Sequence, residues 1–88
     1  MIASSTRMVG QPVVDSQGAD VGRVDRVLID LATGRVVGVV IAAGGVFGLG
    51  ERHHVIEWNE MKVDARGRRV VLDRPLEEIA AESPLSTL

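Results

Sequence analysis

The sequence predicts an all-β protein, a small and strongly bent β-barrel of about six strands with a short C-terminal helix. Three turns that run from Asp to Gly, at residues 15–18, 30–34 and 64–67, each lie between valine-rich segments. Valine and isoleucine side chains are stiff at χ1, which suits a pleated strand better than a helix. The chain has only one Trp and one Phe, so aliphatic side chains must fill the core. Such a core fits a tightly closed barrel better than a broad sandwich.

Length and composition limit the class of protein. A chain of 88 residues forms one small domain, which buries roughly 60–65% of its unfolded surface and gains from oligomerisation. The net charge of −2 argues against a domain whose main task is to neutralise phosphates. Without cysteine there is no disulfide and no thiolate metal site, which favours a cytoplasmic location.

No segment resembles a signal peptide or a membrane span. The first ten residues lack a basic region followed by an apolar one. The longest uncharged stretch, residues 36–50, is too short and too rich in glycine for a membrane helix. We therefore expect a soluble protein without membrane insertion.

The expected organisation has three parts. Residues 1–7 form a disordered N-terminus, residues 8–74 the barrel domain, and residues 75–88 a short helix and tail. Pro75 suits the first position of a helix, and Glu77 and Glu78 suit its positive N-terminal end. The predicted strands cover residues 11–14, 21–30, 35–42, 52–58, 60–64 and 69–72, and the helix covers residues 75–82.

The hairpin of residues 21–46 is the centre of the predicted fold. Its first strand does not alternate cleanly, and a helix is the competing interpretation. Gly22, the β-branched content and the lack of an N-cap exclude the helix, so the irregular pattern predicts a β-bulge. Its second strand, residues 35–42, is apolar on both faces. We expect the barrel interior to cover one face, and the C-terminal segment or another chain to cover the other.

The order of these residues resembles the PRC-barrel family over roughly four fifths of the chain. The motifs that carry the resemblance are Met8-Val9-Gly10-Gln11-Pro12-Val13-Val14-Asp15, Gly18, Val21-Gly22-Arg23-Val24-Asp25, Val27-Leu28-Ile29-Asp30, Thr33-Gly34-Arg35-Val36-Val37-Gly38, Gly44-Gly45-Val46-Phe47-Gly48-Leu49-Gly50 and Val55-Ile56-Glu57-Trp58.

This family includes the cytoplasmic domain of the photosynthetic reaction centre H subunit, the C-terminal domain of a ribosome maturation factor, and many short stand-alone proteins. The chain looks like the stand-alone kind. The matched residues belong to turns and core, and none belongs to a catalytic motif. The resemblance therefore implies a bent β-barrel used as an adaptor surface.

The glycine-rich segment 44–50 does not fit a phosphate-binding loop. Its glycines follow GxxGxG instead of GxGxxG, no Lys-Ser/Thr follows, and no helix begins after it. A connection between strands is the simpler interpretation. Phe47 then has two alternatives, since a large apolar side chain in such a loop either covers the barrel end or contacts a partner.

His53 and His54 do not form a metal site in this interpretation. Adjacent strand residues point to opposite faces, so the two histidines cannot chelate one ion. His53 and Glu57 share a face, but at about 3.3 Å per residue they lie about 13 Å apart. Surface histidines are expected, and the H-subunit resemblance implies a proton-relay use for such a cluster. We expect no metal and no cofactor.

Catalysis is not expected either. A nucleophile needs a neighbouring base, whereas the serines lie in the termini or in a turn, and Lys62 is the only lysine. The chain is therefore predicted not to be an enzyme.

Two hypotheses for function remain. The first is a non-enzymatic protein-interaction module, expected to be a homodimer, because so small a barrel has excess apolar surface. The alternative is an RNA- or ribosome-associated domain that contacts phosphates through an arginine cluster. The interface residues expected for the first are Val37, Val39, Ile41, Val46, Phe47, Leu49 and Trp58. The RNA contacts expected for the second are Arg66, Arg68 and Arg69.

Overall fold

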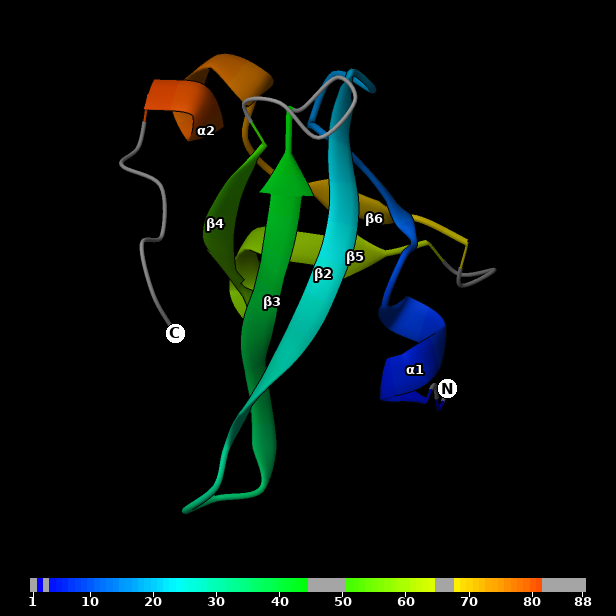
Figure 1. Cartoon of the computed structure of the whole chain (residues 1–88), viewed down its shortest axis with the longest axis vertical. Coiled ribbons are helices and arrows are strands. Elements are labelled where there is room, and N and C mark those ends of the chain that lie inside the picture. Colours follow the sequence, from blue (N-terminus) through cyan, green and yellow to red (C-terminus); the bar gives the residue numbers. More distant parts are fainter. Residues whose placement is uncertain (1, 3, 45–50, 65–67, 82–88) are drawn as a thin grey trace.

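A computed structural model describes residues 2, 4–44, 51–64 and 68–81 and shows a sheet of six strands with short helices (Figure 1). The expected all-β barrel with a short C-terminal helix is confirmed. The elements are α1 (Ser5–Met8), β1 (Pro12–Val14), β2 (Asp20–Asp30), β3 (Arg35–Ala43), β4 (Arg52–Glu57), the 3₁₀ turn η1 (Trp58–Glu60), β5 (Met61–Val63), β6 (Val70–Leu72) and α2 (Leu76–Ala81).

The strand order across the sheet is β4-β3-β2-β1-β6-β5. All pairs are antiparallel except β1 and β6, which run parallel. The hairpin β2–β3 is the longest pair, and β5 and β6 cross behind it in Figure 1. The sheet therefore curls on itself as a half-barrel, and its concave side holds the core.

The core is aliphatic, as the composition predicts. Each central strand contributes fully buried side chains to one cluster, and Ile79 of α2 closes the end of the barrel. Burial of a Val, Leu or Ile side chain stabilises a fold by about 1.5–3 kcal/mol. The buried cluster comprises Met8, Val13, Val21, Val24, Val39, Ile41, Ala43, Ile56, Met61, Val70, Leu72 and Ile79.

Two bulges interrupt the pairing of β2 with β3. The register shifts between Val24 and Arg26, which leaves Asp25 as the extra residue on β2. It shifts again where Leu28 pairs with Gly38 and Ile29 pairs with Val36, which leaves Val37 as the extra residue on β3. Each bulge reverses which residues face the core. The bulge expected in the second predicted strand is therefore present.

Two glycines let neighbouring strands approach closely. A Cβ on Gly22 would lie 1.9 Å from the carbonyl oxygen of Ala42, and a Cβ on Gly38 would lie 2.2 Å from that of Ile56. Both contacts are with backbone atoms, which cannot move aside without shifting a strand. The tight coiling of β2, β3 and β4 thus depends on these two positions.

Asp15 joins the first turn to the last helix. Its Oδ1 accepts hydrogen bonds from the backbone N–H groups of Gln17 (2.9 Å) and Ala19 (2.8 Å), and its Oδ2 accepts one from Leu76 (2.7 Å). Burial of the carboxyl group acts to raise its pKa, but these backbone donors outweigh it and lower the pKa below its usual value. A turn residue near the N-terminus thereby caps α2.

The distal part of the hairpin, residues 28–37, extends beyond the body of the barrel, and we call it the arm (Figure 1). The arm turns at Asp30, whose Oδ1 accepts a hydrogen bond from Ala32 N–H (2.8 Å) and whose carbonyl accepts one from Gly34 N–H (2.7 Å). Gly34 has φ +73°, which favours glycine. The predicted Asp-to-Gly turn is thus present.

The N-terminal segment contains a short helical turn. Residues 1–7 were expected to be disordered, but Ser5–Met8 form the helical turn α1, and Met8 is buried in the core. The side chain of Gln11 helps to hold this turn, because its Nε2 donates to the carbonyl of Arg7 (2.9 Å). The polar residues 4–7 in front of Met8 gave no apolar pattern from which this helical turn could be predicted.

Candidate functional site

An apolar groove lies beside the arm, and we call it the Trp58 groove. Its volume is about 670 Å³. Trp58 is 43% exposed and Val36 is 38% exposed, so large apolar side chains at its rim face solvent. The groove is lined by Ile2, Ser5, Met8, Val27, Val36, Trp58, Met61, Lys62 and Val63.

The folding of four segments brings these residues together. The second bulge turns Val36 toward the same side as Val27, whereas a regular strand would turn it away. η1 begins at Trp58 after a capping box, in which the side chains of Glu57 and Glu60 each accept a backbone N–H of the other residue. This turn fixes the tryptophan at the junction of β4 and β5.

The arm continues this apolar surface. Ile29 is 50% exposed and pairs with Val36, and Leu31 at the turn is 93% exposed. These aliphatic side chains of the arm are exposed, so they do not stabilise the fold by burial in its core. Neighbouring exposed apolar residues of this kind are typical of a contact surface.

The structure corrects part of the predicted interface. Val39 and Ile41 were expected on an outer face of the third strand, but both are fully buried in the core. The bulge at Val37 reverses the alternation, so the two residues lie on the concave side. Val37 and Trp58 are exposed, as an interface requires. The other three predicted interface residues, Val46, Phe47 and Leu49, lie outside the described residues.

The convex face of β3 is also covered within the chain. Val40 is fully buried, although it belongs to no part of the core cluster. It lies between its cross-strand partners Arg26 and Val55, whose side chains flank it on the same face. The expectation that both faces of this strand are covered holds at Val40, and side chains of its own sheet contribute that cover.

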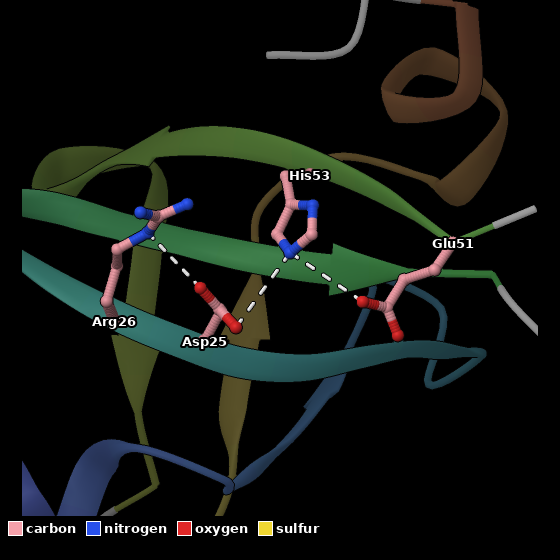
Figure 2. Close-up of polar contacts among 4 residues, drawn as sticks. All are labelled: Asp25, Arg26, Glu51 and His53. Atoms are coloured by element: carbon pink, nitrogen blue, oxygen red, sulfur yellow. Dashed lines mark ion pairs between the residues drawn. The ribbon is translucent and has the colours of Figure 1, made fainter. Parts of the chain in front are cut away.

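A polar cluster lies on the same convex face (Figure 2). His53 Nε2 lies 3.8 Å from Asp25 Oδ1 and 3.7 Å from Glu51 Oε1, and Arg26 Nε lies 3.2 Å from Asp25 Oδ2. The bulge on β2 directs the Asp25 carboxylate toward β4. These side chains are 32–45% exposed, so each ion pair contributes about 0–1 kcal/mol.

The two histidines face opposite sides of β4, as predicted. Both were also expected at the surface: half-buried His53 belongs to the convex polar cluster, but His54 is only 6% exposed on the concave side, so this expectation is wrong for His54. A small pocket near α2 includes His54, Arg52 and Ile79. Among the described residues, no group of three or more His, Cys, Asp or Glu side chains could hold a metal ion.

The predicted arginine cluster is only partly described. Arg68 is exposed, and Arg69 Nε lies 3.6 Å from Asp64 Oδ2 across the end of the last hairpin. Arg66 lies outside the described residues. An acidic partner therefore already engages one of the three arginines.

The fold and these surfaces define a small half-barrel with an exposed apolar groove. The PRC-barrel domain profile matches residues 2–79, and the chain belongs to the PRC-barrel family. The match begins six residues before the expected barrel domain, so it includes all of α1, and it ends within α2.

A solved structure has the same fold. It is RimM from Pseudomonas aeruginosa, named as a 16S ribosomal RNA processing protein, with 16% sequence identity and a TM-score of 0.55. The comparison covers 85% of this chain and 45% of the RimM chain, so the chain spans less than half of that protein. No curated protein matches the chain.

Of the residues that line the groove, only Trp58 was predicted from the sequence as an interface residue. Met8, Val36 and the β5 residues Met61 and Val63 lie in three different segments, and only the curled sheet brings them together. A signal was present in Met8, an apolar residue that directly follows the polar run of residues 4–7. Within the described ranges, no helix is long and apolar enough to cross a membrane.

Proposed function

We propose that this protein is a non-enzymatic protein-interaction module, an adaptor that acts as a homodimer and binds a partner protein in the Trp58 groove. The observation that carries the proposal is the groove itself, which presents half-exposed Trp58 and Val36 beside an apolar arm. Tryptophan is enriched among the residues that dominate binding energy at interfaces.

The chemistry of the groove defines the partner segment. Seven of the nine lining residues are apolar, and Lys62 is the only charged one. Lys62 takes part in none of the ion pairs found among the described residues. The segment that fits is an apolar stretch of a protein with a carboxylate at its edge, placed to meet Lys62.

The lining has few polar side chains, as a contact surface does. Its polar side chains are Ser5 and Lys62, and it holds no His, Asp or Glu that could act as a base toward Ser5. A contact surface needs no such pair.

Site-specific photo-cross-linking in the source cell tests this function. The photoreactive residue benzoylphenylalanine replaces Val36 at the groove rim, and a control places it at Gln17, an exposed turn residue away from the groove. We expect a defined protein adduct from the groove position that Lys62→Glu removes, because the reversed charge repels the partner carboxylate.

The test compares the amounts of adduct formed at the two positions, and their dependence on Lys62→Glu. Equal adducts from Val36 and Gln17, or an adduct insensitive to Lys62→Glu, would contradict groove binding. Sedimentation of the purified wild-type chain tests the homodimer separately, and a strict monomer at tens of micromolar would contradict it.

Association with RNA or the ribosome is the second candidate. Arg68 is an exposed cation beside the last hairpin, and the protein of similar fold carries the name of a ribosomal RNA processing protein. This function would use Arg66, Arg68 and Arg69 for phosphate contacts. Binding should then be strongest at low salt and weaken with added salt, and no RNA binding at low salt would dispose of it.

A further inference from the structure

The two edges of the sheet differ in how they are protected. β5 at one edge has three residues, and an exposed lysine, Lys62, stands in its middle. Short edge strands that carry lysine resist pairing with other chains. β4 at the other edge has six residues, Arg52–Glu57, without proline, glycine or a register shift against β3. β4 thus has the form of a strand that accepts a partner strand.

The exposed side chains of β4 lie mainly on its convex face. Val55 is 41% exposed, Glu57 is exposed, and His53 is half-buried beside Asp25 and Glu51. An apolar residue at the centre of the edge thus has an acidic residue on one side and a histidine on the other.

Symmetry limits how two copies of β4 can pair. In an antiparallel pair, residues directly opposite each other point to the same face. The two-fold axis must therefore lie midway between one residue of the strand and the same residue of the second copy. An axis at His54 would place Glu51 opposite Glu57 of the partner subunit, which is repulsive. An axis at Val55 places Val55 opposite its own copy, and His53 opposite Glu57 of the partner subunit on both sides. Of these two registers, only the second places a hydrogen-bond donor, the His53 imidazole, opposite a carboxylate and Val55 opposite an apolar side chain.

We infer that two copies of this chain join through their β4 edges into one continuous sheet, with Val55 on the two-fold axis. This inference rests on the proposed homodimer and specifies its interface. The second copy provides backbone hydrogen bonds along the edge and covers the exposed Val55 side chain.

Disulfide trapping tests the register, because the chain contains no cysteine. Opposed residues of an antiparallel pair have Cα atoms about 4.5–5.5 Å apart, which a disulfide can span. We expect Val55→Cys to form a disulfide dimer as its main species under mild oxidation. Val9→Cys is the matched control: Val9 is also 47% exposed but lies between α1 and β1, away from the β4 edge, so it should remain mostly reduced.

A charge substitution tests the same contact without oxidation. Val55→Lys places two like charges on the axis, and sedimentation should show at least a tenfold rise in the dimer dissociation constant. Val9→Lys should leave this constant unchanged. Circular dichroism confirms folding of each variant, and both changed side chains are already exposed.

The outcomes separate this interface from the proposed function. A dimeric wild type whose Val55→Cys variant forms no disulfide would overturn the β4 interface alone. A monomeric wild type would overturn both the interface and the homodimer. Loss of the Val36 photo-adduct in Lys62→Glu, with the Val55→Cys disulfide retained, would support the groove and the edge as separate surfaces.

Discussion

The hairpin β2–β3 consists of two parts that have the same residue types and different surroundings. Within the barrel, Val24, Val39 and Ile41 are at most 2% exposed. In the arm, Ile29 and Val37 are 50% and 47% exposed. The bulges at Asp25 and Val37 shift the alternation along the hairpin. Valine and isoleucine thus support the fold in one part, and in the other they are available for contact.

The largest expected difference is between two isoleucines. Ile41→Ala should lower the free energy of unfolding by about 2–5 kcal/mol, because it leaves a cavity among fully buried side chains. Ile29→Ala in the arm should lower it by less than about 1 kcal/mol. Urea unfolding of the two variants measures the difference, and equal losses would contradict the division into barrel and arm.

A cost of about 1–3 kcal/mol is expected for Gly38→Ala, at the boundary of the two parts. The new Cβ would lie 2.2 Å from the carbonyl oxygen of Ile56, so β4 must shift away from β3. Gly10→Ala is the control, because a Cβ there has no atom within 4 Å and faces only the strain of φ +89°. Thermal unfolding should show the larger loss at Gly38, and the reverse order would contradict the close approach.

Asp15→Asn should lower the melting temperature by several degrees at neutral pH. The lowered pKa of Asp15 means that its contribution to stability is full above the unfolded-state value of 3.8 and is lost as pH falls through the folded-state pKa. The gap between wild type and variant should therefore narrow in acid. Asp20→Asn, at the exposed start of β2, is the control. A gap that stays constant down to low pH would contradict the role of the carboxylate.

The smallest effect is expected for Val37→Ala in the arm. This side chain is 47% exposed, so the free energy of unfolding should change by no more than about 0.5 kcal/mol. Val39→Ala, two residues further along β3, is the matched control and should cost clearly more, because Val39 is fully buried. A similar loss for the two valines would show that the bulge does not divide them.

The sequence predicted much of the fold because turn chemistry is local. Asp30 and Gly34 form the predicted turn, and the strands on both sides end within about a residue of their predicted limits. The parallel pairing of β1 with β6 was not predicted, since no local signal links residues almost sixty positions apart.

The candidate site was less predictable for a different reason. The alternation of side chains between the two faces reverses at a bulge, and the sequence pattern does not show where the bulge lies. Val39 and Ile41 were therefore assigned to the wrong face. Their neighbours on the strand, Gly38, Val40 and Ala42, are not polar either, which leaves no polar residue to mark the outside. Trp58 was predicted as an interface residue because it is one of only two large aromatic residues in the chain. The contribution of Met8 and Val63 to the groove lining depends on tertiary packing.

Binding of an apolar, negatively charged ligand in the Trp58 groove can be measured with a dye of that chemistry. Anilinonaphthalene sulfonate carries apolar rings and one anionic group, and Trp58 is the only tryptophan of the chain. We predict saturable binding in which Trp58 emission falls as dye emission rises by energy transfer, and a several-fold weaker affinity in Lys62→Glu. Dye binding that leaves Trp58 emission unchanged, or a dye affinity that Lys62→Glu does not change, would contradict binding in the Trp58 groove.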